Sequence, residues 1–496
     1  MHRTSTASMT DDSPIRIAVI GSGPAGFYTA GHLLKDAGGR LEVDMIERLP
    51  TPWGLVRSGV APDHPKIKSV TRIYEKTAAH PRFRFFGNVH FGEHVSREDL
   101  LAHYHAIVYA TGSPIDRPLG IPGEDLRGSH PATEFVGWYN GHPDHRDLEV
   151  AVDSATRAVV IGNGNVALDV ARMLSLTRAE LAPTDIADHA LDVLERNRVE
   201  EIVVVGRRGP AQSAFTNPEL LELGELSDAD VIVDPAELDR ALAVEDPHAT
   251  PTAERNVAVL REYAARAPLG RRRRIVLRFL LSPVAILGDR AHGVTGVEFA
   301  HNELTPDPAG ALRAHATGEH ETIPAGLVFR AIGYRGIPLP GVPFDERLGV
   351  IPNSDGRVLN PATGAPIAGE YVVGWIKRGP SGVIGTNKKD AQQTVDAILA
   401  DLLGSADGEV SPLAPASPDP AAVESMLLSR QPDLVTYAGW SEIDRHERSL
   451  GEPVGRPRVK LTRIEEMLRI AASEGPSEED LDERRPAEPA RSPGDG

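Results

Sequence analysis

Strand-like and helix-like stretches alternate in two similar sets along the chain. In the first set, 15–20 and 41–47 are rich in apolar and β-branched residues, which is typical of strands. Between them, apolar positions over 27–35 recur at helical spacing. Strands that alternate with helices are typical of a parallel sheet, so the pattern predicts an α/β fold with two βαβ units. The second set has the same order, with a strand at 158–161, a helix at 166–174 and a strand at 201–205.

A glycine-rich turn joins the first strand of each set to its helix. The first turn carries Gly21, Gly23 and Gly26, and the second carries Gly162 and Gly164 at matching positions. Glycines let the backbone approach a pyrophosphate closely, and the start of the following helix supplies N–H groups and partial positive charge. Because strand, turn and helix occur in order twice, the sequence predicts two bound dinucleotides.

Opposite charges follow the second strand of each set. Glu47 ends the first set, whereas Arg207 and Arg208 follow the second. A carboxylate accepts hydrogen bonds from free ribose hydroxyl groups, while guanidinium groups suit a 2′-phosphate. We therefore expect FAD at the first turn and NADP(H) at the second. A polar excursion over 177–198 makes the second unit longer than is usual for this motif.

The remaining pattern predicts more strands, a helix and a linker. A strand over 106–112 ends in a tight turn, and the stretch 405–420 has the Pro-, Ala- and Ser-rich composition of a linker. Helical patches follow from 421 to 472. The other predicted elements are strands at 274–281, 295–299, 326–333 and 370–374, and an amphipathic helix at 387–403.

The composition excludes some kinds of redox chemistry and argues against some partners. The 496 residues include no cysteine, so the chain has no redox-active thiol pair and no cysteine-ligated iron–sulfur cluster, and electrons must pass through a bound flavin. The formal net charge of −18 argues against nonspecific nucleic-acid binding. We expect no metal site, no membrane span and, because the N-terminus lacks an apolar signal core, a cytoplasmic location.

Four stretches carry a more specific likeness. Residues 51–65, 162–172, 205–210 and 373–387 resemble the adrenodoxin-reductase-type ferredoxin–NADP reductases, in particular their actinobacterial members, and the likeness runs from about residue 15 to residue 470. The resemblance implies two Rossmann-like domains, with an NADP-binding domain inserted into a discontinuous FAD-binding domain. The expected limits are 14–115 and 333–472 for FAD and 116–332 for NADP, between disordered ends at 1–13 and 473–496.

The resemblance also implies contact residues for both nucleotides. A further acidic position, Glu219, would contact NADP. The expected FAD contacts include Ala25, Glu47, Leu55 and Phe91. The expected NADP contacts include Asn163, Gly164, Asn165 and Val166 at the pyrophosphate, and Arg207 and Arg208 at the 2′-phosphate. From the residues alone, Leu55 and Phe91 are equally well explained as ordinary core.

The stretch that begins at Gly374 is expected to face the flavin ring. Many two-nucleotide flavoproteins end this strand in Gly-Asp, but here Trp375 follows the glycine, which fits the adrenodoxin-reductase branch. Trp375 would lie near the ring, although a place in the core is the alternative. Gly382, Val383 and Ile384 precede a helix, whose N–H groups and dipole would stabilise negative charge at the N1 and C2 edge.

His64 and Glu222 match family positions that meet near the nicotinamide. Such a pair would orient the carboxamide or manage a proton, because imidazole titrates near neutral pH. Without the family likeness, a histidine before proline is more often a turn residue. We expect the pair to tune a hydride transfer that depends mainly on geometry.

A run of four arginines, Arg271, Arg272, Arg273 and Arg274, stands out in an acidic chain. Ferredoxins are typically acidic, so this patch is a candidate docking surface, with a solvated loop as the plainer alternative. The predicted function is FAD-dependent NADPH:ferredoxin oxidoreduction. The alternatives are a general NADPH dehydrogenase or diaphorase, a less favoured flavin monooxygenase, and a noncatalytic nucleotide sensor.

Overall fold

The computed structural model describes residues 14–36, 39–244, 246–403 and 413–473. The predicted disordered ends, 1–13 and 473–496, lie outside the described residues except for Ser473, and so does the first part of the predicted linker, 405–412. In the described part, no helix has both the length and the apolar character needed to cross a membrane.

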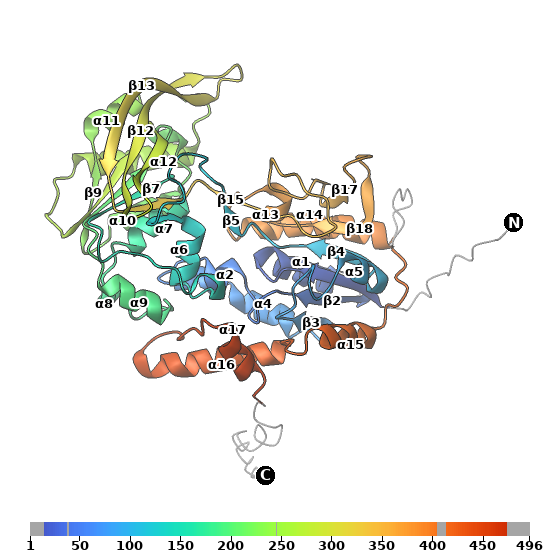
Figure 1. The fold of residues 1–496 in the computed structure, drawn as a ribbon. Helices are drawn as coiled ribbons and strands as arrows, with labels where there is room; N and C mark the ends of the chain where they lie inside the picture. The colour runs from blue at the N-terminus through green and yellow to red at the C-terminus, as the bar shows by residue number, and fades with distance from the viewer. Residues whose placement is uncertain (1–13, 37–38, 245, 404–412, 474–496) are drawn as a thin grey trace, which may run out of the picture.

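The first sheet is built from both ends of the described chain (Figure 1). Its strand order is β16-β17-β18-β4-β1-β2-β3, and β18 returns from far along the sequence to pair in parallel with β4. The four strands β1 to β4 are mutually parallel, whereas β16 and β17 are antiparallel. The strands are β1 (Ile15–Ile20), β2 (Leu41–Ile46), β3 (Phe83–Phe86), β4 (Ala106–Tyr109), β16 (Asn353–Ser354), β17 (Arg357–Leu359) and β18 (Pro366–Val372).

The second sheet is wholly parallel and uses the middle of the chain. Its order is β6-β14-β7-β8-β10-β9. Because both of its faces are covered, its strands are nearly continuous apolar runs. The strands are β6 (Ser129–Pro131), β7 (Arg157–Ile161), β8 (Glu201–Val205), β9 (Ala229–Val233), β10 (Arg273–Arg278) and β14 (Leu327–Arg330).

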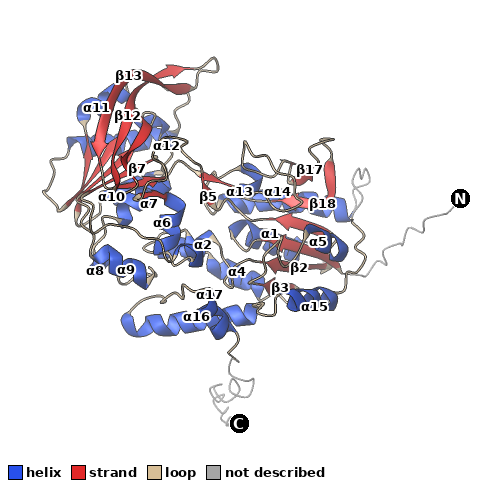
Figure 2. Ribbon diagram, viewed as in Figure 1, coloured by secondary structure: helices blue, strands red, loops and turns tan. Residues whose placement is uncertain are grey.

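Two smaller antiparallel sheets complete the strands. A three-stranded sheet packs on the second sheet, and the loop end of β12 and β13 extends away from the rest of the molecule (Figure 2). A two-stranded ribbon pairs β5 with β15 where the chain leaves and re-enters the first sheet. The strands are β11 (Leu281–Asp289), β12 (Gly293–Pro306), β13 (Leu312–Pro324), β5 (Ile115–Asp116) and β15 (Tyr334–Arg335).

Helices flank both parallel sheets (Figure 2). Those that follow or precede strands of the first sheet are α1 (Pro24–Asp36), α2 (Leu55–Ser58), α3 (Pro65–Lys68), α4 (Thr71–Ala78), α5 (Arg97–His103), α13 (Trp375–Arg378), α14 (Thr386–Leu403), α15 (Pro420–Arg430), α16 (Tyr437–Gly451) and α17 (Ile464–Ala471). Those of the middle segment are α6 (Ala132–Tyr139), α7 (Asn165–Met173), α8 (Arg178–Leu181), α9 (Asp188–Glu195), α10 (Asn217–Leu223), α11 (Pro235–Ala241) and α12 (Pro251–Ala265). Short 3₁₀ turns are η1 (Pro143–His145), η2 (Pro210–Gln212) and η3 (Glu452–Val454).

The predicted elements exist, with two corrections near the end of the second sheet. The predicted strand 274–281 is wrong at its end, because β10 stops at Arg278 and Leu281 opens β11 in another sheet. Leu280 takes a left-handed φ of 58° at the change of direction. The segment 295–299 belongs to β12 of the antiparallel sheet. The polar excursion 177–198 forms α8 and α9, and Thr177 and Glu180 make a capping box at its start.

Helix α16 lies below both halves of the molecule (Figure 1) and carries a fully buried carboxylate. Glu447 accepts hydrogen bonds from the Arg57 guanidinium at 2.9 and 2.5 Å, and Arg458 lies 3.3 Å away. It also accepts the Leu461 N–H at 2.8 Å. Burial alone would raise the pKa of Glu447, but the two guanidinium groups outweigh it and lower that pKa. Glu447 therefore joins α2, α16 and the segment before α17.

We expect Glu447→Gln to lower the free energy of unfolding by about 3 kcal/mol, because it leaves buried guanidinium charge uncompensated. The folded-state pKa of Glu447 is depressed, so its contribution is present above the ordinary carboxyl pKa of 4.5 and disappears as pH falls through the lowered value. Denaturant unfolding at pH 7 and near pH 3 measures both effects.

Glu442→Gln is the matched control on the same helix, because Glu442 pairs with the exposed Arg445 and should contribute no more than about 1 kcal/mol. Equal stability losses in the two variants would contradict the role given to Glu447.

Candidate functional site

Two glycines of the first turn are closely packed, and the third faces open space. Gly21 has a φ of 104°, and a Cβ there would lie 2.6 Å from the Ala110 carbonyl oxygen. A Cβ on Gly26 would lie 2.2 Å from the Gly21 carbonyl oxygen, so both positions need the bare backbone. A Cβ on Gly23 would meet nothing within 4 Å. The space beside Gly23, at the start of α1, fits a phosphate-bearing ligand.

Glu47 is held against this turn. Its carboxylate accepts hydrogen bonds from the Ser22 N–H at 3.0 Å and the Ser22 hydroxyl at 2.7 Å, and the Leu49 N–H donates to it at 3.0 Å. The carboxylate thus stands at the carboxyl edge of the sheet, directly beside the glycine turn. From this position an acidic side chain can accept hydrogen bonds from ribose hydroxyl groups.

The other positions expected to contact FAD have different surroundings. The segment that leads into Leu55 lies on the turn, since a Cβ on Gly54 would be 2.9 Å from the Gly23 Cα atom. Leu55 itself is 40% exposed, whereas Phe91 is buried with its ring 6.0 Å from that of Tyr109. Leu55 is therefore available to a ligand at the turn, and the Phe91 side chain belongs to the core.

The end of β18 meets the same turn. Gly374 has a φ of 80°, and a Cβ there would lie 2.6 Å from the Ala25 Cβ atom, so α1 and the strand end are in close contact. Trp375 stacks on Tyr334 with ring centroids 5.3 Å apart, and its buried Nε1 has no hydrogen-bond partner among the described residues. An unpaired indole N–H at this place fits a ligand acceptor.

The segment before α14 differs slightly from the prediction. The helix begins at Thr386, one residue earlier than expected, and the Thr386 hydroxyl accepts the Val383 N–H at 3.1 Å. The Val383 N–H is therefore already paired. Gly382 has a φ of 79° and Val383 is 56% exposed. Ile384 lies between them and the helix, so the three residues form an exposed turn at the start of α14.

The second glycine turn repeats the arrangement of the first. Gly162 has a φ of 134°, and a Cβ there would lie 2.1 Å from the Ala331 carbonyl oxygen. A Cβ on Gly164 would meet only the Ala214 Cβ atom, at 3.9 Å. The side chain of Asn163 donates to the Ser213 hydroxyl at 3.1 Å, and that of Asn165 accepts the Thr216 N–H at 2.7 Å. Helix α7 starts at Asn165 and continues through Val166.

The two arginines after β8 form no ion pair with any residue that the structure describes. Within the described part of the chain, neither Arg207 nor Arg208 makes an ion pair, and Arg208 donates only to the Gln212 carbonyl at 3.3 Å. Burial, followed by repulsion from Arg207 and Arg313, lowers the pKa of Arg208. Two neighbouring arginines, with Asp246 as the one acidic side chain in the described ranges that acts on Arg208, form a favourable site for a phosphate.

His64 and Glu222 meet, although 158 residues separate them. The His64 Nε2 atom lies 2.9 Å from the Glu222 Oε2 atom, and this contact joins the start of α3 to α10. Glu219, one turn earlier on α10, accepts the Thr216 hydroxyl. Burial raises the pKa of Glu219, with smaller contributions from neighbouring acidic side chains. The predicted pair is thus assembled by contact between the two halves of the molecule.

An ion cluster beside this pair was not predicted. Arg172, 5% exposed at its side chain, pairs with Asp63 and, at 2.5 Å, with Asp169, and its Nε atom is 4.0 Å from Glu222. Burial raises the pKa of Asp169, and Arg172 opposes this effect. Two signals were present in the sequence: Asp63 precedes His64, and Asp169 and Arg172 are one helical turn apart after the glycine turn.

The four-arginine run does not form an exposed patch. Arg273 is buried and pairs with Asp228 at 2.8 Å, and Arg271 and Arg272 donate to backbone carbonyl groups. Arg274 is exposed and pairs with Glu201 at the start of β8. The run therefore lies at the amino end of this sheet, about 16 Å of strand away from the nucleotide turn at its carboxyl end. The prediction of a four-arginine surface is wrong, because strand formation buries part of it.

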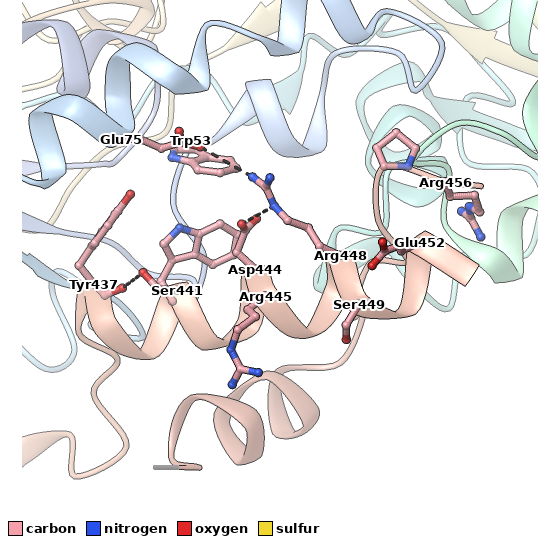
Figure 3. Close-up of a pocket in the computed structure, with 12 residues that line it drawn as sticks. Trp53, Glu75, Tyr437, Ser441, Asp444, Arg445, Arg448, Ser449, Glu452 and Arg456 are labelled. Carbon is pink, nitrogen blue, oxygen red and sulfur yellow. Dashed lines mark hydrogen bonds and ion pairs between the residues drawn. The ribbon is translucent and has the colours of Figure 1, made fainter. Parts of the chain in front are cut away.

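A groove of about 860 Å³ lies along α16, with Trp53 in its lining (Figure 3). Arg448 reaches from α16 toward Glu75 at 3.8 Å and pairs with Asp444 at 2.6 Å. The lining carries acidic and basic side chains in equal number, and Arg445 and Arg456 pair with Glu442 and Asp188 outside it. Among the residues described, no three histidine or acidic side chains gather to hold a metal ion.

Comparison with known proteins gives the same picture. The family model for pyridine nucleotide-disulphide oxidoreductases matches residues 15–203. NADPH-ferredoxin reductase FprA of Mycobacterium tuberculosis is 54% identical over 92% of this chain and 99% of its own length. The solved structure of that protein in complex with NADPH superposes with a TM-score of 0.86 at 53% identity, over 92% of this chain and 99% of the other.

The chain belongs to the FprA-type NADPH-ferredoxin reductases. The mitochondrial NADPH:adrenodoxin oxidoreductase of Arabidopsis thaliana is 39% identical over 94% of the chain and 97% of its own length, which places the group within the adrenodoxin reductase family. This FprA-type reductase is a ferredoxin–NADP reductase, an oxidoreductase with a flavoprotein fold. The family resemblance, the fold class and the enzyme class predicted from the sequence are confirmed.

Proposed function

We propose that this reductase holds FAD at the first glycine turn and NADPH at the second, and passes electrons from NADPH to a ferredoxin. The contact between His64 and Glu222 carries the proposal, because it brings the α3 side of one nucleotide unit against the α10 side of the other. Bound FAD would accept an electron pair and release electrons singly to an iron–sulfur acceptor. We assign 14–115 and 333–472 to FAD binding and 116–332 to NADP binding.

The surroundings of the first turn support FAD as its ligand. Open space beside Gly23, the carboxylate of Glu47 and the N-terminus of α1 suit a pyrophosphate and an unphosphorylated ribose. Ala25 and Gly374 bring the end of β18 to the same place, so Trp375 would lie beside the ring system. Gly382, Val383 and Ile384 would face the ring edge through the start of α14.

The second turn supports NADP in the same way. Gly164 leaves room for the pyrophosphate, and Asn163, Asn165 and Val166 surround the start of α7. Arg207 and Arg208 would bind the 2′-phosphate, because neither of them makes an ion pair with a described residue. Glu219 would contact NADP from the same helix as Glu222.

His64 and Glu222 would orient the nicotinamide end of NADPH rather than react with it. The Glu222 carboxylate lies 2.9 Å from the His64 imidazole and 4.0 Å from the Arg172 guanidinium. These two contacts restrict the orientation of the Glu222 side chain. Hydride transfer depends on the distance and alignment between the donor carbon of the nicotinamide and the acceptor nitrogen of the flavin. These side chains act by restricting that geometry.

Ferredoxin is the proposed electron acceptor, because relatives over the whole chain are named for it. The structure does not support docking on Arg271–Arg274 as a unit. Only Arg272 and Arg274 are exposed, and both lie at the sheet end opposite the nucleotide turn. We therefore assign no docking role to this run.

The proposed activity predicts two events in one anaerobic experiment. Addition of NADPH should bleach the flavin of the purified protein within seconds, and NADH should act more slowly. A ferredoxin should then accelerate cytochrome c reduction, with a rate that falls as salt rises. Rapid bleaching without ferredoxin acceleration would instead favour a general NADPH dehydrogenase, and an absence of bleaching would favour a nucleotide sensor.

The two arginines should determine the preference for NADPH. Each charge-assisted hydrogen bond contributes about 1.5 to 3 kcal/mol. The double variant Arg207→Ala with Arg208→Ala should therefore reduce the ratio between the rates of flavin reduction by NADPH and by NADH, both measured at the same subsaturating concentration, by at least about 10-fold. The rate with NADH should change little. Arg274→Ala, an exposed arginine of the same sheet, is the control, and an equal effect in that variant would contradict the assignment.

Glu222→Gln keeps the shape of the side chain but removes its charge. We expect flavin reduction at saturating NADPH to slow by about 10-fold, because the imidazole loses its charged partner and the nicotinamide loses alignment. Stopped-flow bleaching measures the rate, and Glu225→Gln, three residues further along, serves as the control. An unchanged rate and an unchanged nicotinamide affinity would remove Glu222 from the mechanism.

A further inference from the structure

Two buried charged side chains and one half-buried lysine meet where three separate parts of the chain come together. Asp185, in the polar excursion, lies 2.6 Å from the Lys68 ammonium and 3.2 Å from the Lys460 ammonium. Lys68 ends α3, and Lys460 lies between α16 and α17. The side chain of Lys460 is 1% exposed and that of Asp185 is 9% exposed. We call these three residues the Asp185 cluster.

The Asp185 cluster depends on its single carboxylate. Burial lowers the pKa of both lysines, and Asp185 opposes this shift in each case. Burial would raise the pKa of Asp185 itself, but the two ammonium groups outweigh it and hold that pKa far below its usual value. The Asn140 side-chain oxygen accepts weaker hydrogen bonds from both lysines, at 3.4 and 3.3 Å. Without the carboxylate, the two ammonium groups would face each other with only neutral acceptors, the Asn140 amide and the Arg57 carbonyl, which lies 3.1 Å from the Lys460 ammonium.

Helix α3 has little else to hold it. It is only four residues long, and none of its residues is buried. Its last residue, Lys68, is the one that reaches Asp185. The Lys68 N–H also donates to the His64 carbonyl at 3.2 Å, so the tether lies one helical turn from the imidazole. On the other side of His64, Asp63 pairs with Arg172. An ion pair on each side of His64 therefore connects this part of the chain to the middle segment.

The polar excursion supplies one of these anchors. Asp185 lies in the connection between α8 and α9, the part that lengthens the second nucleotide unit beyond its usual size. Arg456 fixes this connection by donating to the Thr184 carbonyl at 2.9 Å and by pairing with Asp188. The excursion is thus a rigid attachment point rather than a free surface loop.

We propose that Asp185, Lys68 and Lys460 are positioning residues for hydride transfer, because they hold α3, and with it His64, at a set place against Glu222. This inference rests on the proposed function, since it assigns His64 and Glu222 to the nicotinamide. None of the three side chains needs to touch a nucleotide. A displacement of about 1 Å at the reacting groups can cost 100-fold in rate, so the attachment of this four-residue helix has a direct kinetic effect.

Asp185→Asn in the full-length, FAD-loaded protein tests the proposal. We expect the limiting rate of flavin bleaching at saturating NADPH to fall by about 10- to 100-fold, while the NADPH dissociation constant changes less than about 3-fold, because Arg207, Arg208 and the second turn are untouched. A merely structural effect would reduce the yield of FAD-loaded protein and leave its limiting rate unchanged. Stopped-flow measurement on the FAD-loaded fraction separates the two, and that second result would overturn the proposal.

Lys68→Met is the second variant, because it leaves Asp185 paired with Lys460 and so avoids an unpaired buried carboxylate. It should give the same loss of limiting rate. Asp192→Asn is the matched control in the same excursion, since Asp192 is 69% exposed at its side chain and pairs only at 3.7 Å with Arg178. A wild-type rate in Lys68→Met, or an equal loss in Asp192→Asn, would overturn the proposal.

The wild-type protein reports separately on the proposed function. If NADPH fails to bleach the wild-type flavin, the proposed function fails before any variant is compared. If the wild-type protein bleaches but ferredoxin has no effect, the acceptor assignment fails while the ratio between variant and wild type still measures the Asp185 cluster.

Discussion

Parallel pairing of β18 with β4 is the constraint on which the rest of the molecule depends. The chain leaves the first sheet after β4, builds a complete second sheet, and must return to lay β18 beside β4 in register, with Tyr371 opposite Val108. Gly374 then lies against Ala25 at the start of α1. The return thus brings the strand end that carries Trp375 to the first glycine turn. A side chain larger than hydrogen at Gly374 would separate the strand end from the turn.

Polar and charged contacts join the two nucleotide units in addition to apolar packing. Ala61 of the first segment packs in the apolar cluster of the second sheet, and the polar contacts between the units include Arg172 with Asp63, His64 with Glu222, and the Asp185 cluster. Such contacts are directional, so they specify one orientation of the units more narrowly than apolar packing would. Their net contribution to stability is modest, because desolvation offsets much of the attraction. We infer that their value in this reductase is geometric.

Local pattern was sufficient for most of the fold and for the position of each turn. β1 and β8 have the predicted limits, and α7 differs by one residue at each end, because alternating apolar runs and glycine turns are local signals. The arginine run shows where local reading fails. Four adjacent cations suggest a surface, yet strand pairing of β10 places Arg273 inward beside Asp228, which a charge count does not reveal. The end of β10 was missed for the same reason, since Leu280 turns the chain into a different sheet.

The sequence by itself determined the two glycine turns, the charge that follows each of them and the absence of any thiol chemistry, because these depend on residues close together in the chain. Local pattern did not show that His64 meets Glu222, which only the family resemblance predicted, and the tertiary structure alone decided that Gly374 lies against Ala25 and that Asp185 lies between Lys68 and Lys460. Each of these contacts joins residues more than 100 positions apart. Hydrophobic periodicity carries no information about such pairs, since it specifies which face of an element is buried and not which distant element covers it.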